Sequence, residues 1–170
     1  MPPVTREIFA DVLLLAGCIM LQVLIAPLIA IGTVTPDFVL IGVFSVGARR
    51  GRMAGAVAGF AAGLLMDLSL GEVAGLFALA KTIAGFGSGF LHDAEHPGDV
   101  IRTTRFVSVT LLLAFGHNLL TLLLYLRVMS ASYATLLLAH GVGGAIYSTV
   151  FTASAVLILS RIAHRIDVQG

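Results

Sequence analysis

Residues 51–71 read GRMAGAVAGFAAGLLMDLSLG, where small residues recur at every fourth position as Gly51, Gly55, Gly59 and Gly63. The next step of four reaches Asp67. An interior glycine costs a water-soluble helix about 0.8–1 kcal/mol relative to alanine, whereas in a bilayer small residues spaced by four let helix backbones meet. We therefore expect a membrane helix packed closely on its neighbours. Asp67 should point into the bundle, because a charge at the bilayer centre costs about 2.5–3.5 kcal/mol.

The composition of the whole chain agrees with a membrane protein. Of its 170 residues, 58% are hydrophobic and 11% are charged, against about 25% charged in soluble domains. The mean hydropathy is +1.04. This length suits one domain, and the apolar segments leave no room for a globular catalytic module. We expect the single cysteine, Cys18, to be a buried and inert thiol.

Six apolar segments follow one another with short polar connectors between them. A helix needs about 20 apolar residues to cross the hydrocarbon. We predict one all-α integral membrane domain, residues 1–170, with six transmembrane helices at about 8–31, 36–48, 53–70, 73–91, 106–126 and 134–160. The first run is too long for the core of a signal peptide, so we expect it to be retained. Pro27 should kink that first helix.

The positions of the basic residues predict the orientation. With the amino terminus in the cytoplasm, eight of the ten Lys and Arg residues face the cytoplasm: Arg6, Arg49, Arg50, Arg52, Arg102, Arg105, Arg161 and Arg165. Cytoplasmic loops of membrane proteins carry such an excess. Both termini should therefore be cytoplasmic.

The second segment is too short to cross a bilayer. Between Pro36 and Arg49 there are too few residues for about 30 Å at 1.5 Å per residue. Either Arg49 and Arg50 snorkel to the cytoplasmic surface from well inside the inner leaflet, or the residues before the helix are recessed below the outer surface. Pro36 suits a first helical turn, and Asp37 would meet the positive end of the helix dipole there.

Several polar side chains fall inside the apolar segments. Asp67 and Lys81 lie on a helical hairpin, so an ion pair between them is possible; a structural pair, a ligand or partner contact and simple snorkelling remain open. His117 and Asn118 are adjacent in the fifth segment, and Gln22 lies in the first. Hydrogen bonds between helices explain such groups in most cases, and lining a pocket is the alternative.

Signatures of catalysis are missing. The sequence contains no G-x-S-x-G elbow, no H-E-x-x-H motif and no phosphate-binding GxxxxGK[ST] loop. The histidines and carboxylates of residues 92–99 are more typical of a solvated loop than of a zinc site. We therefore expect a protein that is not an enzyme and has no cofactor, no metal site and no nucleic-acid partner.

Residues 35–86 resemble the bacterial rod shape-determining protein MreD family. The resemblance is carried by Pro36, Asp37 and Phe38 opening a short helix, by the basic turn after it, and by the small-residue helix ending in Gly63-Leu64-Leu65-Met66-Asp67. A short glycine-containing turn and a fourth helix then follow. The family motif supports Pro36, Asp37, Phe38, Gly55, Gly59, Gly63 and Asp67 as functional residues, but not Lys81.

The resemblance implies a non-catalytic scaffold of the cell-elongation complex in the bacterial inner membrane. Its partners would be MreC and, in the wider complex, MreB, RodA and a penicillin-binding transpeptidase, which together direct peptidoglycan synthesis and cell shape. A second copy of this chain and membrane lipid are further candidate partners. The family's fold is similar to the substrate-binding (S) subunit of energy-coupling-factor transporters.

That similarity leaves a second function open, a solute-binding subunit of a vitamin transporter. Such subunits dock through small residues on their first helix, for which Ala26 and Ala30 have a suitable spacing. Pro27 between them argues against a regular docking face. The chain also has no tryptophan and three tyrosines, which is poor material for an aromatic vitamin pocket.

Overall fold

A computed structural model gives the arrangement of the chain. It describes residues 3–30, 35–70, 75–93 and 104–128, together with residues 146, 150, 153, 154 and 157. Within these residues all regular structure is helical, and no β-strand is present. The helices are α1 (Pro3–Leu24), α2 (Phe38–Arg50), α3 (Arg52–Leu70), α4 (Leu76–Ser88) and α5 (Thr104–Val128), with short 3-10 turns at Ala26–Ile29 and Gly89–Leu91.

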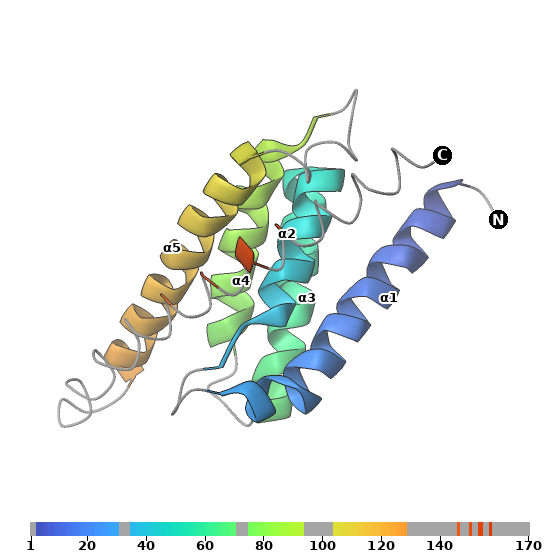
Figure 1. Cartoon of the computed structure of the whole chain (residues 1–170). Helices are drawn as coiled ribbons and strands as arrows, with labels where there is room; N and C mark the ends of the chain where they lie inside the picture. The colour runs from blue at the N-terminus through green and yellow to red at the C-terminus, as the bar shows by residue number, and fades with distance from the viewer. Residues whose placement is uncertain are drawn as a thin grey trace.

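Helices α2, α3 and α4 form the centre of the molecule, with α5 beside α4 and α1 beside α2 (Figure 1). The most extensive packing joins α3 to α4. In contrast, α1 diverges from the other helices toward its amino end, and most of its described side chains are exposed. The bundle is therefore a tight centre with one loosely attached helix.

Two sides of α2 build the apolar core. One cluster joins Val39 and Val43 of α2 to Ala62 and Met66 of α3. The other side of α2 packs on α4 and α5 through Leu40, Phe44, Ala84 and Ala114. A helix of only 13 residues can be buried on both sides because α1, α3, α4 and α5 surround it.

The glycines of α3 lie against α4, as the four-residue spacing predicted. A Cβ atom added at Gly55 would overlap the backbone of Gly85, and one added at Gly59 would overlap the backbone of Lys81. At Gly63 the same atom would come within 2.5 Å of the Cα of Ala78. Hydrogen atoms alone fit in this interface, so the close contact requires glycine on α3.

The first helix differs from the prediction. A single apolar segment was expected over 8–31, with a kink at Pro27, but α1 ends at Leu24 and a 3-10 turn follows over Ala26–Ile29. Proline has no amide hydrogen and its ring clashes with the carbonyl four residues earlier. The proline therefore belongs to a helix terminus rather than to a kink.

The expected segments at 36–48, 53–70, 73–91 and 106–126 correspond to helices α2, α3, α4 and α5. By length and hydropathy alone, one helix among the described residues, Thr5–Leu24, is long enough to cross a membrane; Leu76–Leu91 and Ser108–Leu124 are apolar but shorter. The sixth expected segment, 134–160, lies outside the described residues except at the five isolated positions. A count of six spans stays a prediction.

Candidate functional site

A buried polar cluster forms where α1, α2, α4 and α5 come together. Asp37 is the N-cap of α2, and its Oδ1 accepts a hydrogen bond from the amide of Leu40 at 2.9 Å. Its Oδ2 is paired with the ammonium of Lys81 from α4, and Nε2 of His117 from α5 lies 3.6 Å from the same oxygen. The Oε1 of Gln22 from α1 accepts a hydrogen bond from the backbone amide of Phe38, 2.7 Å away. We call these four side chains, Gln22, Asp37, Lys81 and His117, the Asp37 cluster.

Burial gives this cluster its energetic weight. Lys81 is 0% exposed and His117 is 4% exposed. Removing one partner of a buried ion pair leaves an uncompensated charge, which costs about 3–5 kcal/mol. The ammonium of Lys81 also lies 5.7 Å from the ring centre of Phe77, within the range of a cation–π contact. Asp37 and Lys81 therefore fix the position of α4 relative to α2.

The fifth helix brings further polar atoms to the interior. The Nδ1 of His117, the Nδ2 of Asn118 and the Oγ1 of Thr110 are buried and have no hydrogen-bond partner among the described residues. His117 and Asn118, the two adjacent residues singled out from the sequence, therefore differ in their contacts. His117 faces the Asp37 cluster, whereas the amide of Asn118 does not join it.

The ion pair between Asp67 and Lys81 that the sequence left possible does not form, because Lys81 pairs with Asp37. Asp67 instead accepts hydrogen bonds from the first amides of the α4 region: Gly75 at 2.9 Å, Phe77 at 2.9 Å and Ala78 at 3.1 Å. The first amides of a helix have no partner within the helix, and a negative charge is favoured there by the helix dipole. Asp67 lies beside the first amides of α4, whereas Lys81 lies more than one turn farther along α4, where it pairs with Asp37.

The motif of three residues at 36–38 forms the entry to α2. Pro36 is fully buried, Asp37 caps the helix, and Phe38 is the first helical residue and donates its amide to Gln22. Pro36 and Asp37 were expected in the first turn of the helix, but α2 begins at Phe38 and both residues precede it. The reason is that a capping side chain lies just before the helix that it caps. The contact of Gln22 had a signal in the sequence, because an amide side chain within an apolar segment predicts a hydrogen bond to another helix.

A second polar group lies at the other end of α2, and the sequence analysis missed it. Asp11 of α1 is 8% exposed. Its Oδ1 lies 3.0 Å from Nη2 of Arg49, and its Oδ2 lies 2.7 Å from Nη1 of Arg50. The sequence did offer a signal, because Asp11 is a carboxylate within the first apolar segment and a pair of arginines follows at the end of the second segment. Both guanidinium groups are therefore held by α1 rather than simply extended toward water.

The sequence was compared with known proteins. The family model described as rod shape-determining protein MreD matches residues 6–153. No curated protein matches the chain. The family match covers α1 to α5 and therefore includes both polar groups described above, and it lends no support to the vitamin-transporter alternative.

Proposed function

The chain belongs to the MreD family of rod shape-determining proteins, because the family model covers most of its length, and from this premise we propose that it is a non-catalytic scaffold which binds MreC. Members of this family are membrane proteins with a role in rod shape determination. The proposal also includes a position in the inner membrane, six transmembrane helices in one domain, 1–170, and both termini in the cytoplasm. An S-subunit-like arrangement of the helices belongs to the same proposal.

The use of the charged side chains supports this proposal. Asp37 and Asp67 both cap helices, and Lys81 neutralises Asp37. At the other end of α2, Asp11 holds two arginines. Each of these groups is engaged in fixing one helix against another. This is what a rigid body needs in order to hold partners in position, and it differs from the partly free acid and base of a catalytic site.

The proposed mechanism is positional. The glycine contact between α3 and α4, together with the buried pair of Asp37 and Lys81, gives a body with little internal freedom. Such a body can present fixed faces to the membrane helix of MreC and to a second copy of itself. The wider complex would contain MreB, RodA and a penicillin-binding transpeptidase, so that peptidoglycan synthesis occurs where the scaffold places it.

Depletion of the protein from a rod-shaped bacterial host tests the proposal. We expect rounded cells and loss of MreC from the material that co-purifies with the remaining synthases in mild detergent. Expression of the wild-type chain should restore both. A Gly17→Ala variant should restore them equally well, because a Cβ atom at Gly17 meets nothing within 4 Å. Normal rods with an intact MreC complex after depletion would contradict the proposal.

A further inference from the structure

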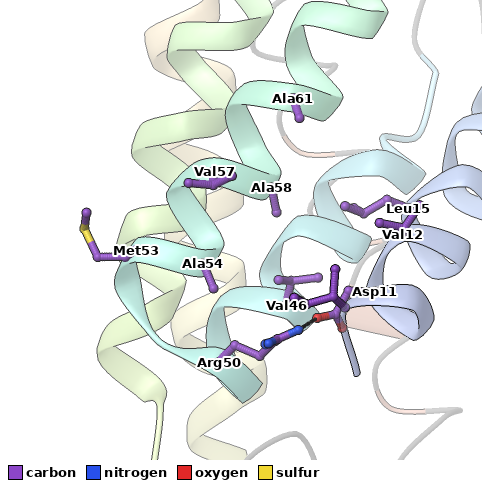
Figure 2. A pocket seen from close by; sticks show the side chains of 11 residues that line it. Asp11, Val12, Leu15, Val46, Arg50, Met53, Ala54, Val57, Ala58 and Ala61 are labelled. Carbon is purple, nitrogen blue, oxygen red and sulfur yellow. Dashed lines mark hydrogen bonds and ion pairs between the residues drawn. The ribbon is translucent and has the colours of Figure 1, made fainter. Parts of the chain in front are cut away.

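An apolar groove runs between α1 and α3 at the end of the bundle that holds the arginine ion pairs. Its volume is about 460 Å³. Figure 2 shows Val12 and Leu15 of α1 on one wall and Ala58 and Ala61 of α3 on the other, with Arg50 at the end of the groove. The groove exists because small residues form the wall on α3 while α1 diverges from it.

The walls of the groove suit a hydrocarbon chain. Among the described residues, the side chains along it are apolar apart from the ion pair of Asp11 and Arg50. In a bilayer the immediate surroundings are acyl chains. Apart from that ion pair, a polar ligand from water would find no hydrogen-bonding side chain among the described residues of the walls, whereas an acyl chain would gain contact on both sides.

The charges at the end of the groove select the headgroup. Arg50 lines the end of the groove, and the neighbouring residues 6–11 and 49–52 contain four arginines and two carboxylates. One of these arginines, Arg52, lies over the ring of Phe90 instead. Asp11 is shared by Arg49 and Arg50, and the exposed Glu7 lies 4.0 Å from Arg50, so Arg6, Arg49 and Arg50 outnumber the two carboxylates by one. Arginine clusters where membrane helices meet the cytoplasmic leaflet attract anionic lipid headgroups, and guanidinium groups bind phosphate in a bidentate manner.

We propose that this groove binds one anionic glycerophospholipid of the cytoplasmic leaflet, with an acyl chain between α1 and α3 and the phosphate beside Arg50. The lipid would fill the space between the loosely attached α1 and the rigid centre. The site is separate from the Asp37 cluster and does not depend on the binding of MreC, but its place in the cytoplasmic leaflet rests on the proposed orientation of the chain.

Photocrosslinking tests the proposal on the full-length protein. The chain is reconstituted in nanodiscs of equal parts phosphatidylglycerol and phosphatidylcholine, with a photoactivatable acyl chain on one lipid or the other, and labelled peptides are mapped by mass spectrometry. We expect phosphatidylglycerol to label the peptides of residues 8–15 and 53–61 severalfold more than phosphatidylcholine. Arg50→Gln should lower this preference about fivefold. Ala61→Phe, which fills the groove without changing charge, should reduce labelling by both lipids.

Two further variants separate headgroup recognition from damage to the fold. Asp11→Asn removes the competing carboxylate and should raise the preference for phosphatidylglycerol. Arg105→Gln removes one arginine from α5, none of whose described side chains lines the groove, and should leave the preference unchanged. Equal labelling by the two lipids, a preference indifferent to Arg50→Gln and Asp11→Asn, or groove peptides crosslinked to another protein copy instead of lipid would each overturn the proposal.

Discussion

Helices α3 and α4 meet along their backbones, whereas α1 meets the rest of the bundle through side chains. At Gly55 and Gly59 nothing larger than hydrogen fits against α4, while around Gly17 on α1 there is open space. The first interface also carries Asp67 of α3, which accepts hydrogen bonds from the first amides of the α4 region. The second carries ion pairs whose arginine side chains remain 34% and 24% exposed.

The difference indicates two kinds of attachment within one membrane protein. A backbone contact depends on shape, so it tolerates almost no change in side-chain volume. A side-chain contact with open space beside it can adjust to substitution and can admit a lipid. We therefore expect the centre, α2 to α4, to behave as the rigid body and α1 as the adjustable element.

The largest effect is expected from Lys81→Met. This change leaves the carboxylate of Asp37 buried without its main partner, and we expect a loss of about 3–5 kcal/mol in the free energy of unfolding. Denaturation in mixed micelles measures it. The double variant Asp37→Asn with Lys81→Met should recover most of the loss, because asparagine is neutral and still caps a helix. A double variant as unstable as the single one would argue against the pair.

The next effect compares two glycines. Gly55→Ala pushes a methyl group into the backbone of Gly85, and overpacking of this kind costs about 1–3 kcal/mol. Gly17→Ala meets nothing within 4 Å and should be neutral or slightly stabilising, since alanine favours the helix. Thermal unfolding of the two purified variants measures the difference. Equal stability of both would break the distinction between the two interfaces.

A smaller effect is expected at the start of α4. Asp67→Ala removes the acceptor of three backbone amides, and the loss of a helix cap costs about 0.5–2 kcal/mol. Hydrogen exchange of the amides at Gly75, Phe77 and Ala78 should increase more than exchange elsewhere in α4. Asp67→Asn keeps one side-chain acceptor and should lie between wild type and alanine. Uniform protection across all three proteins would contradict the capping role.

The smallest effect belongs to α1. Asp11→Asn weakens two ion pairs with partly exposed arginines, and such pairs contribute about 0–1 kcal/mol. We expect little change in unfolding of the centre, with faster proteolysis or exchange confined to α1. The same measurements made on Lys81→Met should show the opposite distribution. Global destabilisation by Asp11→Asn would show that α1 is an integral part of the rigid body.

Much of the local structure could be predicted from the residues alone. The apolar segments located helices α2 to α5, and the four-residue spacing of Gly55, Gly59 and Gly63 predicted their close contact with a neighbour. Asp37 was expected near the start of α2 on grounds of the helix dipole. These predictions succeed because helical periodicity, capping and small-residue packing act over a few residues of chain.

The partners of the charged groups could not be predicted in this way. The hairpin suggested Asp67 for Lys81, but Lys81 pairs with Asp37 across 44 residues of sequence, and Asp11 reaches Arg49 across 38. Which carboxylate meets which cation depends on the depth and rotation of each helix once the bundle has packed. The spacing of residues along the chain determines where each helix forms, how it is capped and which face packs closely. Ion pairs between helices are decided only by the tertiary structure, because the glycine contacts must first set the distances between the helices.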